Sequence, residues 1–208
     1  MGDEPQLVAV GERVALGPIR KDLVDRYLRW VNDLEVRHGL ANLGLYTPES
    51  EETWYAEASA AMGKREPDEV HFTIYDRSDG APVGTTGLFQ LEWRLSRGRF
   101  GILLGERRGA GLGTEATRLT LDWAFTVLGL HNIMLEVLPW NARAIRAYER
   151  AGFRMIGRRR DALISFGLRC DEVLMDAVAS EFEGSVLTPR ELGPDPPEPD
   201  PPGPEPAG

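Results

Sequence analysis

Apolar residues recur along the chain with two different periods, and each period predicts one kind of element. Residues 70–74, Val-His-Phe-Thr-Ile, alternate as in a strand with one buried face, and residues 12–16 form an earlier strand candidate. Near the N-terminus the apolar residues are spaced as on one face of a helix: Ile19, Leu23, Tyr27, Trp30 and Leu34. The chain is therefore expected to open with a strand followed by an amphipathic helix.

A second helix is predicted to begin just after Thr47. Pro48 suits the first helical position, and Glu49, Glu51 and Glu52 complement the positive end of the helix dipole.

From residue 83 onward the pattern predicts two antiparallel strands, a helix, a strand, a short helix and two closing strands. In order, they span Val83–Leu91, Arg99–Leu104, residues 113–128, Ile133–Leu138, Asn141–Ala151, Phe153–Ile156 and Glu172–Met175. This alternation of strands and helices indicates the α/β class.

The chain has 208 residues, of which 42% are hydrophobic, enough for one sizeable core. We therefore expect one α/β domain over residues 1–180, followed by an acidic, proline-rich tail over residues 181–208. Eight of the sixteen residues from Gly193 to Gly208 are proline and almost none is apolar, so the tail is expected to be disordered.

The net charge of −9 argues against a general nucleic-acid binder, because the phosphate backbone would be repelled. No apolar run is long enough to span a bilayer, and Cys170 alone offers neither a disulfide framework nor a multi-cysteine metal site. Together these features predict a cytoplasmic protein that binds no metal, membrane or nucleic acid.

Four glycines at positions 105, 109, 111 and 113 lie between the apolar segment 102–104 and an amphipathic helix. Glycine adopts left-handed backbone conformations readily and places no side chain over the N–H groups. Because the N–H groups at a helix start are unpaired and the dipole is positive there, the loop suits an anion such as a pyrophosphate. Arg107 and Arg108 are expected to add positive charge at its mouth.

Three anion-binding patterns can be compared with this loop. A P-loop ends in Gly-Lys-Ser/Thr, which does not occur here, and residues 109–113 do not have the Gly-x-Gly-x-x-Gly spacing of a dinucleotide fingerprint. The sequence does contain Arg-x-x-Gly-x-Gly, from Arg108 to Gly113. On its own this pattern is equally compatible with a tight strand-to-helix turn.

A second informative segment spans residues 136–153. Asn141 suits the N-cap of the predicted short helix, and Ala144, Ile145 and Tyr148 share one face of it. A tyrosine at such a position is commonly a core aromatic residue with a satisfied hydroxyl.

Both segments resemble the two cofactor motifs of the GNAT family of N-acetyltransferases, in the same order. The matching residues are Arg108 to Gly113 in the first motif and Asn141, Tyr148-Glu149 and Ala151-Gly152-Phe153 in the second. The similarity covers residues 83–177, is loose over residues 35–80, and is greatest to the branch of ribosomal-protein and spermidine acetyltransferases (RimJ/RimL-like). It implies the GNAT fold, with a single mixed, mostly antiparallel sheet of six to seven strands, about four flanking helices and a V-shaped opening between the fourth and fifth strands.

The resemblance also implies acetyl-CoA as the acyl donor, and a homodimer as a possible assembly. Backbone groups of residues 102–104 would bond the pantetheine arm, the N–H groups of residues 108–114 would hold the pyrophosphate, and Tyr148 would protonate the departing thiolate as general acid. The full expected set of cofactor-binding residues is Ile102, Leu103, Leu104, Arg108, Gly109, Ala110, Gly111, Leu112, Gly113, Thr114, Asn141, Ala144 and Tyr148.

The motifs do not define the base that takes the ammonium proton. Glu92 is the first candidate, and His38, Asp171 or a chain of water molecules are alternatives, although each side chain also has an ordinary structural interpretation. Cys170 lies far from both motifs in sequence, so direct attack by the neutral amine is expected rather than an acyl-cysteine step.

The expected acceptor is a small-molecule amine. A protein N-terminus, transfer of another acyl group such as succinyl, and a non-catalytic acyl-CoA sensor stay open as alternatives. Polyamine-acetylating relatives tend to carry an acid just before the aromatic residue of the cofactor strand, whereas this chain has Arg99 before Phe100. If Arg99 faces the acceptor, a substrate with its own carboxylate or phosphate is favoured.

Overall fold

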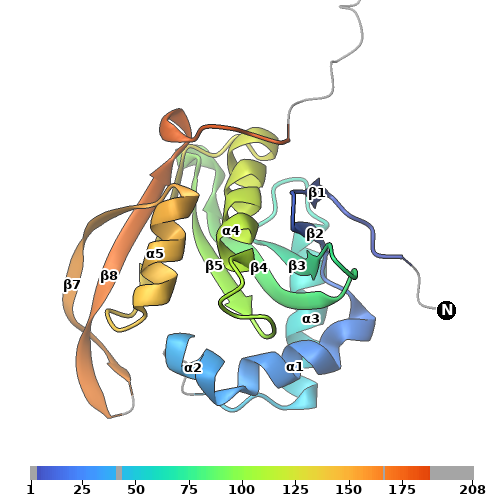
Figure 1. Ribbon diagram of the computed structural model, residues 1–208, viewed down its shortest axis with the longest axis horizontal. Helices are drawn as coiled ribbons and strands as arrows, with labels where there is room; N and C mark the ends of the chain where they lie inside the picture. Colours follow the sequence, from blue (N-terminus) through green and yellow to red (C-terminus); the bar gives the residue numbers. More distant parts are fainter. Residues whose placement is uncertain (1–3, 41–43, 166, 188–208) are drawn as a thin grey trace, which may run out of the picture.

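The computed structural model describes residues 4–40, 44–165 and 167–187. Within these residues the chain forms one sheet of eight strands in the order β1-β2-β3-β4-β5-β6-β8-β7 (Figure 1). Every neighbouring pair is antiparallel except β5 and β6, which run parallel. The strands are β1 (Ala9–Val10), β2 (Val14–Pro18), β3 (Val70–Asp76), β4 (Pro82–Glu92), β5 (Arg97–Leu104), β6 (Asn132–Val137), β7 (Arg154–Ser165) and β8 (Leu168–Val178).

This sheet confirms the expected mixed, mostly antiparallel α/β fold. The described chain has eight strands rather than six to seven, because β1 is only two residues long and too short to show a period in the sequence. The two closing strands are also longer than predicted, at 12 and 11 residues. They form a hairpin that extends along one side of the molecule (Figure 1).

Five α-helices accompany the sheet within the described residues. They are α1 (Val24–Asn32), α2 (Leu34–Leu40), α3 (Pro48–Met62), α4 (Leu112–Asp122) and α5 (Ala142–Ala151). The predicted start of α3 is confirmed: Thr47 and Ser50 form a reciprocal capping box, and Pro48 is the first helical residue.

The helix predicted over residues 19–34 is interrupted at Asp33. The backbone of Asp33 is extended (ψ 127°), and its carboxylate accepts hydrogen bonds from the N–H groups of Glu35 (2.9 Å) and Val36 (3.1 Å). An aspartate that caps the next turn competes with helix continuation. The result is two separate helices, α1 and α2, with Asp33 between them.

The predicted helix over residues 113–128 is also divided. Its α-helical part ends at Asp122, and one π-helical turn follows over Trp123–Val127. The buried carboxylate of Asp122 accepts hydrogen bonds from the Thr126 hydroxyl (2.8 Å) and from the N–H groups of Val186 (2.7 Å) and Leu187 (3.0 Å). These bonds tie the last described residues to α4, whereas residues 188–208 of the expected tail lie outside the described chain.

Helices cover both faces of the sheet (Figure 1). On one face, α1 and α3 enclose a small core of Ile19, Tyr27, Trp30 and Ala58. On the other face, α4 and α5 pack over the main core, to which α4 contributes Leu112, Ala116, Leu119 and Leu121. None of the helices in the described part of the chain is long and apolar enough to cross a bilayer.

The two central strands separate soon after they meet. β5 pairs with β6 only over Arg97–Arg99, opposite Asn132–Met134, while its pairing with β4 continues to Leu104. If the two-residue β1 is left out of the numbering, the opening lies between the fourth and fifth strands, as the family resemblance implied.

Gly105, directly after β5, allows α1 to approach the end of this strand. A Cβ atom at position 105 would lie 2.0 Å from ring carbons of Trp30, which is 4% exposed. We expect Gly105→Ala to lower the free energy of unfolding by about 1–3 kcal/mol, because the buried ring must move to make room. Urea denaturation of the full chain measures this change.

Gly157→Ala in β7 is the matched control. Apart from its chain neighbours, no heavy atom of the described chain lies within 4 Å of a Cβ at that position. We expect Gly157→Ala to change the free energy of unfolding by no more than about 0.5 kcal/mol. Equal effects of the two substitutions would contradict the close contact with Trp30.

Candidate functional site

A cleft of about 410 Å³ occupies the space between the diverging strands β5 and β6. One wall is the edge of β5 from Phe100 to Leu104, and the opposite wall is formed by β6 and the helix α5. The glycine loop closes one end, and α2 borders the cleft through Glu35, Val36, Gly39 and Leu40. Both sequence motifs therefore meet in a single cavity.

The edge of β5 is the first chemical feature of this cleft. Beyond Arg99 the strand is paired with β4 alone, so its other edge faces the cavity. Backbone N–H and C=O groups on a free strand edge can pair with an extended ligand as they would with another strand.

The glycine loop is the second feature. Gly109 (φ 90°) and Gly111 (φ 83°) have left-handed backbones, and Gly111 caps α4, which begins at Leu112. The first N–H groups of a helix have no acceptor within it, and here the cleft is lined at that point by Gly111, Gly113 and Thr114. The start of α4 thus directs a positive helix end at the cleft, and the glycines place no side chains in front of it.

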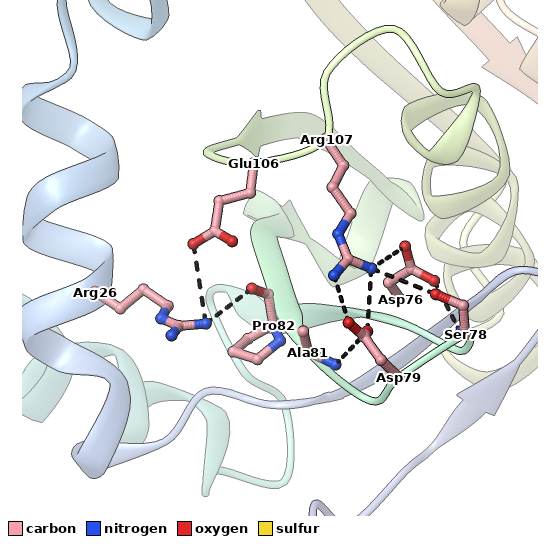
Figure 2. Close-up of polar contacts among 8 residues, drawn as sticks. All are labelled: Arg26, Asp76, Ser78, Asp79, Ala81, Pro82, Glu106 and Arg107. Carbon is pink, nitrogen blue, oxygen red and sulfur yellow. Dashed lines mark hydrogen bonds and ion pairs between the residues drawn. The ribbon is translucent and has the colours of Figure 1, made fainter.

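The two arginines of the loop lie in different places, and the expectation that both add charge at the mouth is wrong for Arg107. Its guanidinium points to the β3–β4 turn, where it pairs with Asp76 and with Asp79 (3.0 Å) and contacts Ser78 (3.4 Å) (Figure 2). This hydrogen bonding lowers the pKa of Asp76 to about 2. Arg107 therefore fastens the loop to the sheet.

Arg108 does line the cleft, but it has protein partners of its own. Its guanidinium lies 3.2 Å from Asp33 and 3.5 Å from Glu35, at the junction of α1 and α2. Hydrogen bonds from Arg108 are the main cause of a lowered pKa of Asp33. Only Arg108 of the two arginines is thus available to a ligand, in competition with these acids.

Two of the expected loop residues do not line the cleft with their side chains. Leu112 is 2% exposed and belongs to the main core, while Ala110 is an exposed loop residue whose N–H donates to the Arg107 carbonyl at 3.4 Å. The roles expected for both concern only their backbone groups and stay predictions.

Tyr148 projects from α5 toward β5. Its ring packs edge-on against Phe100, at 6.0 Å between centroids, and near Phe153, at 5.9 Å. The side chain is half-buried along the cleft, and its partial removal from water raises the pKa of the hydroxyl to about 12. Among the described residues, none forms a hydrogen bond with this hydroxyl, so it differs from the satisfied core tyrosine considered as an alternative.

Asn141 occupies the expected N-cap of α5. Its side-chain oxygen accepts from the Ala144 N–H at 3.2 Å, and its amide nitrogen donates to the Gly39 carbonyl at 3.5 Å. A parallel contact joins Trp140 to the His38 carbonyl at 3.4 Å. The end of α2 is thereby attached to the start of α5 across the cleft.

The three side chains considered as bases lie away from the cleft lining. Glu92 pairs with Arg97 at 2.8 Å at the other end of β5, and Asp171 accepts from the Asp161 N–H at 3.0 Å on the β7–β8 hairpin. His38 packs beside Trp140, with ring centroids 5.8 Å apart. The structure does not bring any of them together with Tyr148.

Several cleft residues were missed in the sequence. Arg143, Arg146 and Arg150 line the cleft along α5, and their spacing of three and four residues was a readable signal for one helix face. Glu136 and Glu172 also line it, and no sequence pattern distinguishes them from the other acidic residues. Within the described ranges, no group of three or more His, Cys, Asp or Glu side chains is placed to hold a metal ion.

Arg99 pairs with Glu136 where the two strands part. Burial raises the pKa of Glu136, and the adjacent Arg99 opposes that rise. The charge of Arg99 is therefore matched by an acid, which removes the reason for expecting an acidic acceptor.

Comparison with known proteins identifies related chains. A family model described as "Acetyltransferase (GNAT) domain" matches residues 13–154. The chain is 34% identical over 152 residues to the probable N-acetyltransferase YjcK of Bacillus subtilis, covering 63% of this chain and 83% of that protein. It is 30% identical over 131 residues to a spermidine N(1)-acetyltransferase of Escherichia coli, covering 62% of this chain and 69% of that protein.

Solved structures with the same fold include a spermidine N-acetyltransferase from Vibrio cholerae in complex with CoA and spermine. The TM-score is 0.75 at 20% identity, over 83% of this chain and 99% of that one. RimJ of Mycobacterium smegmatis in complex with CoA-disulfide gives a TM-score of 0.73 at 24% identity, over 83% and 85% of the two chains.

The Arg107 contacts predict a pH-dependent contribution to stability. The pKa of Asp76 is about 2 in the folded chain, below its ordinary 3.8, so the contribution is present above pH 3.8 and is lost as pH falls toward 2. We expect Arg107→Gln to lower the free energy of unfolding at pH 7, with a difference from wild type that shrinks between pH 4 and pH 2. Urea denaturation at fixed ionic strength across this range measures it.

Arg77→Gln is the control, since Arg77 on the same turn donates to the carbonyl groups of Gly11 and Glu12 rather than to a carboxylate. The loss in free energy of unfolding that Arg77→Gln causes should stay constant across the same pH range. If the loss in free energy of unfolding caused by Arg107→Gln were also independent of pH, the pairing of Arg107 with the Asp76 carboxylate would be refuted.

Proposed function

The chain belongs to the GNAT acetyltransferase family and is an acetyl-CoA-dependent N-acetyltransferase, and we propose that the cleft between β5 and β6 holds acetyl-CoA while a small-molecule amine attacks the thioester directly. The observation that carries this proposal is the meeting of a free strand edge, a glycine loop and Tyr148 in one cavity.

The residues present fit the parts of acetyl-CoA. The free edge of β5 suits the pantetheine arm, whose amide groups can pair with a strand, and Asn141 with Ala144 borders the same path. The left-handed glycines of the loop leave their N–H groups uncovered for the pyrophosphate. The arginines along α5 suit the remaining phosphate charge of the nucleotide end.

Tyr148 is proposed as the general acid. A pKa of about 12 keeps its hydroxyl protonated at neutral pH, so a proton is available when a thiolate departs. Acetyl-CoA supplies the activated acetyl group, and backbone N–H groups of β5 would stabilise the charge that develops on its carbonyl oxygen. Alignment of the reactants within the cleft supplies much of the remaining acceleration.

A small amine is proposed as the acceptor because relatives at 30% identity are named for spermidine and because the charge of Arg99 is matched by Glu136. A protein N-terminus is the main competing acceptor. Release of free CoA thiol with short peptides, but with no small amine, would favour that competitor instead.

The first test of this function replaces the Tyr148 hydroxyl. We expect Tyr148→Phe to lower kcat by about 10²- to 10⁴-fold with an amine acceptor, because the leaving thiolate loses its proton donor. The dissociation constant of acetyl-CoA should be nearly unchanged, since ring packing is kept. Thiol release and calorimetric binding measure the two quantities, and Tyr55→Phe on α3 serves as the control with wild-type turnover.

Full activity of Tyr148→Phe would remove Tyr148 from the acid role. Acetyl-CoA binding without turnover in either protein, with every acceptor class tried, would support the non-catalytic sensor.

The second test concerns the loop. Gly109 and Gly80 both have positive φ values, 90° and 73°, and in both cases the described chain has no heavy atom within 4 Å of an added Cβ apart from chain neighbours. Alanine should therefore strain both backbones similarly, but only at 109 would it cover N–H groups in the cleft. We expect Gly109→Ala to weaken acetyl-CoA binding by about ten- to a hundredfold through lost hydrogen bonds.

Gly80→Ala is the control for strain alone and should leave acetyl-CoA binding unchanged. Calorimetric titration of both variants, with unfolding curves to confirm similar stability, separates the two effects. Equal affinities for acetyl-CoA would contradict the proposed pyrophosphate site.

A further inference from the structure

A second pocket lies on the opposite face of the sheet from α4. It has a volume of about 170 Å³ and is bordered by α1, α3, the segment before α3, and strands β4 and β5. Its lining residues are Tyr27, Trp30, Val31, Tyr46, Glu51, Trp54, Thr85 and Leu103. Leu103 also lines the main cleft, so the same strand borders both spaces.

Glu51 is the only acidic residue among those lining residues. It is 5% exposed, yet among the described residues no side chain or backbone N–H group bonds its carboxylate. A carboxylate that is largely removed from water and has no partner is disfavoured in its charged form. Burial accordingly raises the pKa of Glu51 to about 7.

The position of Glu51 is fixed by its local structure. It lies in the first turn of α3, where the capping box of Thr47 and Ser50 and the proline at position 48 define the helix start. Its N–H group donates to the Thr47 carbonyl at 3.0 Å. The carboxylate is therefore held in the pocket by a well-defined helix end rather than by a partner of its own.

Two of the aromatic side chains that line the pocket form hydrogen bonds with residues outside it. The Tyr27 ring lies 5.8 Å from Trp30 and 5.9 Å from Trp54, measured between centroids. The Tyr27 hydroxyl shares a hydrogen bond with Thr73 at 2.6 Å, and the Trp30 N–H donates to Glu106 at 3.2 Å. With their polar ends engaged elsewhere, these residues offer the pocket aromatic carbon, which attracts cations.

The size of the pocket limits what can enter. Sites for drug-sized ligands commonly measure about 300–1,000 Å³, so 170 Å³ suits one end of a molecule. Val31 and Leu103 provide apolar contacts for methylene groups, and Glu51 would repel a second acid. An unbranched alkylammonium end matches these properties.

Building on the proposed acetyltransferase function, we propose that this aromatic–acid pocket receives the primary ammonium end of the acceptor and that Glu51 is the base that prepares it for attack. The ammonium gives one proton to the Glu51 carboxylate, which passes it to solvent. The freed nitrogen lone pair forms the C–N bond with the acetyl carbon, and the C–S bond breaks with its electron pair on sulfur. Tyr148 protonates that sulfur, and the second proton shed by nitrogen replaces the one that Tyr148 gave.

This assignment explains two otherwise unrelated observations. A pKa near 7 is poor for a structural ion pair but suited to a base that works near neutral pH. The approach of the amine from the α1–α3 face, with the acyl donor along the free edge of β5, brings the two substrates to the same strand at Leu103.

The experiment compares Glu51→Gln with Glu52→Gln, an exposed acid next to it on α3. The acceptor is 1,4-diaminobutane. At pH 7 we expect Glu51→Gln to lower kcat/KM for this amine by about 10²- to 10⁴-fold, the range for loss of a general base. Glu52→Gln should match wild type, and all three proteins should bind acetyl-CoA equally well.

The pH profile separates a base from a merely structural residue. The other titratable residues that line the pocket are phenols, Tyr46 and Tyr27, and burial raises the pKa of Tyr27 to about 12. Wild-type kcat/KM should therefore rise to a plateau near pH 7. In Glu51→Gln it should keep rising toward the pKa of the amine itself, because only amine that is already neutral can react.

Direct binding tests the pocket without turnover. We expect n-butylammonium to bind the full chain saturably in a protein-observed NMR titration, with shifts at Trp30 and Trp54, and n-butanol to bind at least tenfold more weakly. Glu51→Gln should abolish this preference.

A Glu51→Gln variant that folds and keeps the wild-type pH profile and kcat/KM would overturn the base assignment. Absence of butylammonium binding to wild type would overturn the pocket. Both outcomes differ from failure of the proposed function, which would appear as absence of acetyl-CoA binding to wild type.

Discussion

The separation of β5 from β6 after Arg99 is the constraint on which the rest of the structure depends. A parallel pair that ends after three residues leaves backbone groups on β5 without a strand partner and opens a space that helices must border. The ion pair of Arg99 with Glu136 lies at the point of separation, where it joins the two strands. The glycine loop then continues from the far end of β5, and α5 follows β6, so both motifs reach the opening through the course of the strands.

The charged side chains around the glycine loop stabilise the loop through ion pairs, and one of them is also placed to bind a ligand. Arg107 fastens the loop to the β3–β4 turn, and Arg26 contacts Glu106 and the Pro82 carbonyl on the neighbouring side (Figure 2). Arg108 is left to bridge the loop and the junction of α1 with α2 through Asp33. Since partly exposed ion pairs are individually weak, a pyrophosphate can compete for Arg108 without unfolding the loop.

The sequence predicted those features that depend on short-range patterns. Strand periods, the Thr47 cap, the glycine loop and the N-cap at Asn141 all follow from residues that are neighbours along the chain. The break at Asp33 was missed because its side chain competes with the helix only once the next turn is in place. The direction of Arg107 depends on acids some thirty residues away, which no local pattern reveals.

Glu51 illustrates the same limit most clearly. In the sequence it is one of three acids that complement a helix start, and nothing distinguishes it from Glu49 or Glu52. Only the packing of α3 beneath α1 makes one of the three face aromatic rings while another faces solvent. Burial, rather than residue type, raises the pKa of Glu51 to near neutrality, and no pattern in the sequence shows that burial.

The division of the site by β5 has a consequence for specificity. The side of the site proposed for acetyl-CoA is built from the glycine loop, α4 and α5, and it contains both cofactor motifs of the family. The proposed acceptor side is built from α1, α3 and the residues before α3, and the segment from Tyr46 to Trp54 lies outside both cofactor motifs. Changes in that segment can alter the acceptor without disturbing the β5 edge or the glycine loop. A shared donor motif therefore carries little information about the acceptor, and the aromatic–acid pocket is where the acceptor of this chain would be determined.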